Sequence, residues 1–455
     1  MLEASRPVTE RICAEVWSLA EVSFEETASA GVHVRELEAA GFAIVSTGTS
    51  GLPTAFVAEW SHGADGPKVG FLLEYDALPG LGNAAIPRRE ARTDGAESGH
   101  GCGHNLLGAA LTGAAIACKA KMLADDIPGT LRVYGCAAEE TEGAKVFMAR
   151  DGLFDDLDGA LHWHPGPDAL VMNFRLAATH LLRLEFHGRS AHAGLEPWSG
   201  RSALHALELA AHGINAMREH LEPTARVHYV VVEGGRSANV VPDHTELSIY
   251  VRDADRTRVQ ATSDWIQQIG AGAALATQTR ADATAYFGMH DLLPNRPLAE
   301  RMQAHLEHVG VPDWTPDEQA FARACQEQMG HATTGLCTGV SPMQDEPAIG
   351  GSSDVGDVSW NTPTMGIVMP TMPLGVALHT WPVTACGGMS IGTRGAIAAS
   401  EVLARTALDL LTDADLRTSA RRDFERRTAG RPYRSLLTAE QTQPDALRRT
   451  GRDLA

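Results

Sequence analysis

The sequence predicts an α/β fold: a main domain whose mixed, mostly parallel sheet has helices on both faces, and a smaller inserted α+β domain of ferredoxin-like topology. Three observations predict it. The chain has 455 residues, more than one hydrophobic core usually supports. Strands and helices alternate through its first part. From about Arg175 the order changes to strand, helix, strand, strand, helix, strand.

Apolar periodicity and helix-capping residues define the elements of the first part of the chain. The run over 69–74 is apolar up to its final glutamate, which is typical of a parallel strand buried on both faces. In chain order the expected elements are a helix over 7–20, a helix from the 23–27 turn to about 40, strands over 43–46, 54–60 and 69–74, a helix over 106–123, a strand over 130–136, a helix over 144–151 and a strand over 159–162.

The inserted domain is expected over 175–290, so that the main domain consists of 1–174 and 291–455. The arginine-rich tail over 413–455 is expected to form surface helices or an arm against a neighbouring subunit. The remaining expected elements are, within the insert, a strand over 180–187, a helix over 200–220, strands over 226–233 and 245–253, a helix over 256–272 and a strand over 278–286, and, after it, helices over 294–310, 315–330 and 385–412 and a strand over 366–370.

The apolar runs, the cysteines and the net charge of the sequence indicate where the protein is expected to reside and which partners are disfavoured. No stretch of eighteen apolar residues occurs, so no membrane span is expected, and the first ten residues lack the pattern of a secretory signal. Seven cysteines without framework spacing indicate reduced thiols and a cytoplasmic protein. A net charge of −19 disfavours nucleic acid and anionic membranes as partners.

A glycine-rich loop over 98–108 carries the first candidate site. Cys102 and His104 are two residues apart, so on an extended loop both side chains fall on one side and can converge on one metal ion. Cys102 also lies close to a predicted helix start, which favours the thiolate that coordination requires. The alternative is a glycine-rich turn with incidental polar residues.

Further polar clusters follow strands of the main domain, at the edge where open α/β sheets build their sites. Glu139 and Glu140 are adjacent and point opposite ways, so one carboxylate can bind metal while the other serves as a base, although such a pair also suits a solvated helix start. His162 and His164 share a face and could both reach a site, or could simply be packed.

Two clusters lie near the end of the chain. His379 stands in a short apolar segment, where a histidine is by default a core residue. The polar loop over 351–357 contains Asp354, which is expected to orient ligand imidazoles. Mixed cysteine, histidine and carboxylate ligands suit Zn²⁺, Mn²⁺ or Co²⁺.

The ordered series GHGCGHN, AAEETEG, DGALHWHP, GRSAHAG, GGRSANVVPD, SSDVGDVSW and LHTW resembles the dinuclear-metal aminoacylase and carboxypeptidase superfamily. Within it the chain is most similar to the amidohydrolase branch that includes hydrolases of p-aminobenzoyl-glutamate, hippurate and indole-acetyl amino acids. The resemblance covers roughly residues 8–410. Each motif alone is weak, but the series in this order is specific.

The resemblance implies a five-ligand site for two divalent ions, with Cys102 as a bridge. It implies Glu139 as the general base, Asp76 as a support for the ligands, and His162 at the edge of the site as a residue of substrate selection. From the inserted domain, acting as a lid, it implies contacts of His192, Asn239 and Arg252 with the substrate, where His192 serves its own or a partner subunit's site. The implied metal ligands are Cys102, His104, Glu140, His164 and His379.

For Asn239 a turn residue, and for Arg252 a salt bridge at a strand end, remain alternatives. The expected function is metal-dependent hydrolysis of a C–N bond in a small aromatic, carboxylated substrate, such as an N-aroyl amino acid of the aminobenzoyl-glutamate type. Alternatives are release of ammonia from an activated aromatic amine such as a nitroanthranilate, and a non-catalytic metal-binding partner subunit. The expected assembly is a homodimer through the lid.

Overall fold

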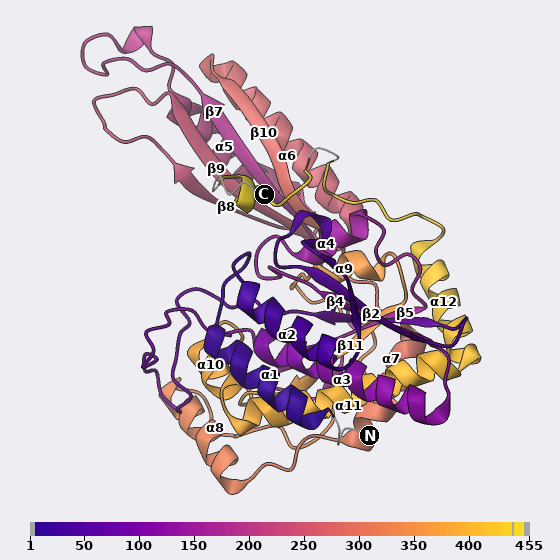
Figure 1. Ribbon diagram of the computed structural model, residues 1–455. Coiled ribbons are helices and arrows are strands. Elements are labelled where there is room, and N and C mark those ends of the chain that lie inside the picture. The colour runs from indigo at the N-terminus through magenta and orange to yellow at the C-terminus, as the bar shows by residue number, and fades with distance from the viewer. Residues whose placement is uncertain (1–4, 439–440, 450–455) are drawn as a thin grey trace.

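The computed structural model describes residues 5–438 and 441–449, and it contains a main domain and an elongated second domain that projects from it (Figure 1). This arrangement confirms the predicted fold class. The main domain contains α1 (Arg6–Leu19), α2 (Thr27–Ala39), β1 (Ala43–Thr47), a 3-10 turn η1 (Thr49–Gly51), β2 (Phe56–His62), β3 (Lys68–Leu73), α3 (His104–Asp125), β4 (Gly129–Gly135), α4 (Ala144–Arg150), β5 (Gly159–Gly166), β6 (Leu170–Val171), α7 (Arg296–Val309), α8 (Pro316–Gln328), α9 (Val355–Ser359), β11 (Thr364–Pro370), α10 (Trp381–Gly387), α11 (Ser390–Thr412), α12 (Ala414–Thr428) and α13 (Asp445–Arg449).

The main sheet is mixed and has the strand order β1-β2-β4-β3-β5-β11-β6. Its central pairs, β4 with β3, β3 with β5 and β5 with β11, are parallel, and the outer pairs are antiparallel. The continuous apolar run of β3 follows from this position, because a central strand has no face toward solvent. The parallel arrangement also brings the carboxyl ends of β3, β4, β5 and β11 to one edge, which is where the candidate ligands lie.

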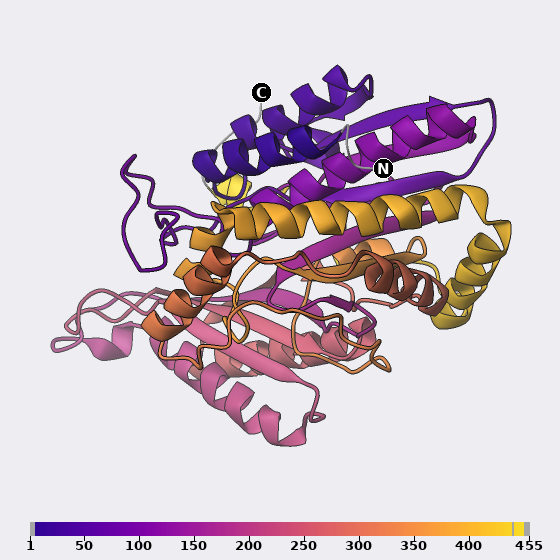
Figure 2. The ribbon, with the colours of Figure 1, turned by 90° about the horizontal axis from the view of Figure 1, so that it is seen from below.

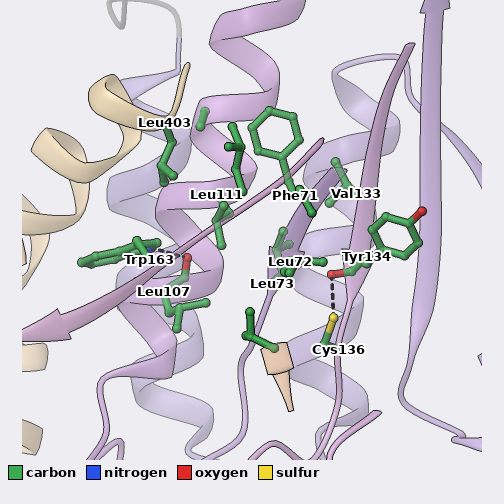
Figure 3. Packing of buried hydrophobic residues seen from close by; sticks show 14 of the residues in the cluster. Phe71, Leu72, Leu73, Leu107, Leu111, Val133, Tyr134, Cys136, Trp163 and Leu403 are labelled. Atoms are coloured by element: carbon green, nitrogen blue, oxygen red, sulfur yellow. Dashed lines mark hydrogen bonds between the residues drawn. The ribbon is translucent and has the colours of Figure 1, made fainter. Parts of the chain in front are cut away.

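Helices cover both faces of this sheet. On one face α2, α3, α11 and α7 follow one another across the strands, and Trp163 of β5 points to this face and donates its indole N–H to Leu107 O in α3 at 3.0 Å (Figure 3). Side chains alternate along a strand, so His162 and His164 point to the opposite face, toward α4 and α9. The core between α3 and the strands consists of fully buried residues such as Phe71, Leu111 and Val133 (Figure 3).

Helix α3 bears on the expectation that no segment suits a membrane. It is 22 residues long with a mean hydropathy of 1.4, enough by length and composition to cross one. The position of α3 explains its apolar composition. Helices α1 and α11 and the central strands surround it, and 72% of its apolar window is buried inside the protein. Its apolar character is therefore accounted for by the core.

The second domain has the predicted ferredoxin-like topology. Its sheet order is β10-β7-β9-β8, all antiparallel, with α5 and α6 packed on one face. Leu184, Leu247 and Ile266 belong to a hydrophobic core separate from that of the main domain. Its elements are β7 (Ala178–His187), a 3-10 turn η2 (Pro197–Ser199), α5 (Ala203–Met217), a 3-10 turn η3 (Arg218–His220), β8 (Arg226–Glu233), β9 (His244–Asp253), α6 (Arg256–Thr277) and β10 (Arg280–Met289).

Two predicted elements differ from the structure. The helix expected over 385–412 is divided into α10 and α11 at the pair Gly387 and Gly388, and a Cβ at Gly388 would lie 2.6 Å from an atom of the Trp17 ring. The polar loop expected over 351–357 ends in a short helix, α9, which begins after Asp354.

The tail runs back over its own chain (Figures 1 and 2). After α12 it crosses to the second domain, where Gln441 donates to Tyr286 O at 2.7 Å and Asp445 pairs with Arg183. The backbone N–H of Asp445 is held at 2.7 Å by Glu142, two residues after Glu140. The tail therefore contacts both domains of this chain; residues 439–440 and 450–455 of the predicted arm lie outside the described residues.

Candidate metal centre

The Cys102 loop is held in place by close backbone contacts. Gly103 has φ +82°, and a Cβ there would lie 2.8 Å from Pro165, so the loop passes directly under the end of β5. Leu78 and Gly99 form a backbone bridge, and the amide of His379 donates to Gly101 O at 2.8 Å. These contacts bring the predicted ligands of three separate segments to one place.

The first group of ligand atoms consists of Cys102, His104 and His164, whose atoms all lie within 4.8 Å of one another. Cys102 Sγ and His164 Nε2 are 3.4 Å apart. The other ring nitrogen of each histidine has a partner: His164 Nδ1 lies 2.7 Å from Pro165 O, and His104 Nδ1 lies 2.8 Å from Asp76 Oδ1. Such partners fix ring orientation, so both Nε2 atoms face the group.

The second group consists of Cys102, Glu140 and His379, again within 4.8 Å of one another. His379 Nε2 and Glu140 Oε2 are 3.3 Å apart. Cys102 belongs to both groups, which is the arrangement that a bridging thiolate requires. His379 is not the core residue that its apolar segment suggested: its side chain is 53% exposed and its φ is +61°, a left-handed conformation rare outside glycine.

The donor atoms fit divalent ions. His104 Nε2 and Glu140 Oε1 are buried and have no hydrogen-bond partner among the described residues, although such groups are costly to leave unpaired. Thiol, imidazole and carboxylate donors together suit Zn²⁺, Mn²⁺ or Co²⁺. Two groups of three ligands, sharing one thiol, fit two such ions.

The electrostatics of the cluster point the same way. Burial raises the pKa of the Cys102 thiol, while His104 acts against this shift. Burial opposes the charge of His104, but Cys102 and Asp76 outweigh it and raise the pKa of this imidazole well above its usual value. Carboxylates and a thiol thus gather around His104, and bound cations would supply further positive charge.

Glu139 lies beside the first group, because its carboxylate is within 4.8 Å of ligand atoms of Glu74 and His104. Its pKa is raised well above the usual value by burial and by the carboxylates of Glu74 and Asp354. Ala138, the residue before it, has φ +55°, and the two carboxylates that follow lie in different groups: Glu139 with His104, and Glu140 with Cys102 and His379.

A buried ion network lies under the cluster and was not expected from the sequence. The Lys145 ammonium, fully buried, lies 2.7 Å from Glu74 Oε1 and 2.6 Å from Asp354 Oδ1. Glu74 Oε2 is in turn 3.3 Å from His104 Nε2. Asp354 therefore holds Lys145 and the loop before α4, and contacts no imidazole in the described part of the chain. The only signal for Glu74 was a carboxylate ending an otherwise apolar strand.

Asp76 and His162 occupy different surroundings. Asp76 accepts hydrogen bonds from Ser23 Oγ and the Glu140 amide, both at 3.0 Å, in addition to its contact with His104. It thus links two candidate ligands. His162 is 5% exposed, and burial lowers its pKa to about 3, so it is neutral and covered in this structure.

The structure does not bring the residues of the second domain to the metal centre. His192 and Asn239 are exposed neighbours, joined by a hydrogen bond from the Ala193 amide to Asn239 O at 3.0 Å. His192 follows the ten-residue strand β7, and Asn239 lies between β8 and β9. The loops after β7 and β8 form the free end of the second domain (Figure 1). Arg252 lies nearer the main domain, with Nη1 3.4 Å from Gly350 O.

Residues 180–275 match the family model of a peptidase dimerisation domain. The chain is 36% identical to one of the subunits of the p-aminobenzoyl-glutamate hydrolase of Escherichia coli K12, over 95% of this chain and 95% of that protein. It is 29% identical to the mouse Xaa-Arg dipeptidase, over 90% of this chain and 87% of that protein. A dinuclear metal-binding peptidase of the M20 family from Bacillus subtilis has a similar fold, with a TM-score of 0.60, 18% identity and coverage of 90% and 99% of the two chains.

Proposed function

This chain belongs to the M20 family of hydrolases that carry a dimerisation domain, and from that premise we propose that it cleaves the amide bond of a small N-aroyl amino acid. Hydrolysis of an amide bond is the reaction in the names of its relatives, and one solved structure of similar fold is that of a dinuclear metal-binding peptidase. The observation that carries the proposal further is the pair of ligand groups that share Cys102, with Glu139 beside them.

We assign the first ion to Cys102, His104 and His164 and the second to Cys102, Glu140 and His379. When bound, such ions polarise an amide carbonyl and lower the pKa of a water molecule toward neutrality. We expect Mn²⁺ or Zn²⁺, and Co²⁺ would also fit, because the site combines a soft thiolate with imidazoles and a hard carboxylate.

Glu139 is the proposed general base. It carries no ligand role in either group, and it lies where its carboxylate can take a proton from a water molecule beside His104. Burial and neighbouring carboxylates raise its pKa, which makes the carboxylate more basic and lets the same group return the proton to the leaving nitrogen. Asp76 orients His104, and Lys145 balances the charge of Glu74 and Asp354.

The substrate class rests on the relatives and on the candidate binding residues. The relative that matches over nearly the whole chain is a p-aminobenzoyl-glutamate hydrolase component, and the substrate in its name joins an aromatic acyl group to an amino acid. Arg252, His192 and Asn239 are the proposed partners of the substrate carboxylate and reacting group, with a guanidinium suited to a carboxylate. His162 is proposed at the edge of the site as a residue of substrate selection; because it is covered, it would act without direct contact with the substrate.

Assembly follows from the position of His192. Strand β7 has ten residues and spans about 33 Å at 3.3 Å per residue, so His192 lies far from its own metal centre. We propose a homodimer through the second domain, in which His192 serves the partner subunit's site. All seven cysteines are free and buried, which agrees with our placement of the protein in the cytoplasm.

Two adjacent substitutions with the same chemical change test the mechanism. Glu139→Gln should lower kcat for p-aminobenzoyl-glutamate by about 10²- to 10⁴-fold while the purified protein keeps two metal ions per chain. Glu140→Gln should lower the metal content to one. Amino-acid release by chromatography and metal content by mass spectrometry give the two readouts. Wild-type turnover in Glu139→Gln, or equal metal loss in both variants, would refute the assignment.

The same assay separates the alternatives. Release of glutamate without ammonia supports the amide substrate, whereas ammonia released from a nitroanthranilate supports an aminohydrolase. A chain that needs a different partner would be inactive when it is purified alone and loaded with metal.

A further inference from the structure

A large cavity lies where the two domains join. Its volume is about 890 Å³, within the range of small-molecule sites. Arg175, on the chain that leads into the second domain, and His290 and Asp291, on the chain that leads out, form part of its wall. The start of α6 and the segment over 426–434 at the end of α12 complete it. The cavity therefore touches both connections between the domains.

The wall of this cavity is strongly basic in an acidic protein. Seven of its lining residues are arginines, although the chain has only 38 lysines and arginines and a net charge of −19. Four of the seven have carboxylate partners. Arg427 pairs with Glu346 at 2.5 Å, Arg175 with Glu346 at 3.5 Å, Arg258 with Asp255 at 3.6 Å, and Arg426 with Asp423.

The other three arginines, Arg256, Arg431 and Arg434, form no ion pair within the described part of the chain. Arg256 Nε is buried without a hydrogen-bond partner. Arg431 stacks over the Trp360 ring at 5.1 Å, which holds its guanidinium plane in the wall. None of these three guanidinium groups forms an ion pair among the described residues, although the charge of Arg256 opposes the burial that raises the pKa of Asp357.

Two carboxylates also line the cavity, but both are engaged by the backbone of α6. Asp255 accepts from the Arg258 amide at 3.0 Å, and Asp291 accepts from the Arg256 amide at 3.4 Å. These contacts cap the start of α6, and among the described residues neither carboxylate forms an ion pair with Arg256, Arg431 or Arg434.

We propose that this cavity binds a small anion with several phosphate groups, at a site separate from the metal centre. Guanidinium groups recognise phosphate oxygens through paired charge-assisted hydrogen bonds, and three unpaired ones around one space suit several phosphates better than one carboxylate. An isolated basic cavity in an acidic protein also concentrates multivalent anions.

The contacts around the cavity give the binding a structural consequence. Asp357 of α9 accepts hydrogen bonds from Tyr433 at 2.7 Å and from the His290 amide at 3.0 Å, so α9 holds the tail and the second connection together. A bound anion would join Arg434, beside Tyr433, to Arg256 in the second domain. Occupancy should therefore restrict the movement of the two domains relative to each other.

Calorimetric titration of the metal-loaded protein with inorganic triphosphate tests the proposal. The wild type should bind one triphosphate per chain, and Arg431→Ser/Arg434→Ser should bind it at least tenfold more weakly. Arg6→Ser/Arg89→Ser removes two exposed positive charges outside the cavity and should bind like the wild type. Triphosphate also chelates divalent ions, but that heat is common to all three proteins.

Hydrogen exchange supplies a second readout. Triphosphate should slow amide exchange over 429–438 and over the two connections in the wild type and the control, and not in the cavity variant. Arg431 and Arg434 are exposed, so their loss should leave the fold and amide hydrolysis intact. Equal titration curves for the cavity variant and the control, or a wild type that shows only the shared chelation heat, would overturn the proposal and leave the proposed function untouched.

Discussion

Removing the buried Lys145 ammonium tests how the metal centre is held together. Its Nζ lies 2.7 Å from Glu74 and 2.6 Å from Asp354, and its side chain has no solvent exposure. Lys145→Met keeps an unbranched chain of similar length but leaves two buried carboxylates without their cation. Breaking a buried ion network in this way costs about 3–5 kcal/mol of unfolding free energy.

The loss of unfolding free energy in Lys145→Met should be smaller at low pH. Burial already raises the pKa of Asp354 to about 6, with Lys145 opposing that shift, so loss of the ammonium moves this pKa higher still. The folded variant then binds more protons than its unfolded chain below that value. Its stability therefore rises as pH falls, and the difference from the wild type should be smaller at pH 6 than at pH 8.

Urea unfolding of the metal-free proteins, followed by circular dichroism at pH 6 and pH 8, measures the difference in unfolding free energy between the variant and the wild type. Lys121→Met is the matched control, because Lys121 forms an exposed pair with Asp125 at 2.6 Å, and its loss should cost at most about 1 kcal/mol. Lys145→Met/Asp354→Asn should regain part of the lost stability. A loss at pH 8 no greater than that of Lys121→Met would show that the network does not stabilise the site as argued.

Two further predictions concern the core and the metal loop. Burial lowers the pKa of His33 to about 3. Below pH 6.5 this histidine is therefore protonated in the unfolded chain but neutral in the folded protein. The free energy of unfolding should fall by about 1.4 kcal/mol per pH unit because of this residue. Urea unfolding between pH 7 and 5 should show a shallower loss for His33→Gln than for the wild type, and equal slopes would contradict this. Gly103→Ala should weaken metal binding and cost more stability than Gly80→Ala, because both have positive φ but only Gly103 would place a Cβ 2.8 Å from Pro165. Calorimetric metal titration and thermal unfolding compare the two variants, and matching results would rule out the close contact as the cause.

Several features could be predicted because their signals are local. The spacing of Cys102 and His104, the paired carboxylates at 139 and 140 and the histidines of β5 are each visible within a few residues. The ferredoxin-like order of elements was likewise readable from periodicity alone. Local sequence was misleading for the helix expected over 385–412, which the structure divides between Gly387 and Ser390. Gly388, between the two helices, lies against the ring of the distant Trp17.

His379 and Lys145 show the same limit at the site itself. An apolar segment made His379 look like a core residue, but its bond to the Gly101 carbonyl holds it in a left-handed turn at the surface of the cluster. Lys145 lies on a predicted helix where a lysine usually faces water. It is buried because α9 and the end of β3 place Asp354 and Glu74 against it.

The sequence by itself determined the elements, the topology of the second domain and the types of donor atom at the metal centre, because helix and strand periods and ligand chemistry are properties of neighbouring residues. Only the tertiary structure gave the distances: the ligand atoms of both groups lie within 4.8 Å of Cys102, and Glu139 lies within 4.8 Å of His104 and Glu74. It also decided that an arginine-lined cavity forms between the domains. The physical reason is that the order of strands in the sheet, with parallel ends at one edge, sets the distances between segments that are tens to hundreds of residues apart.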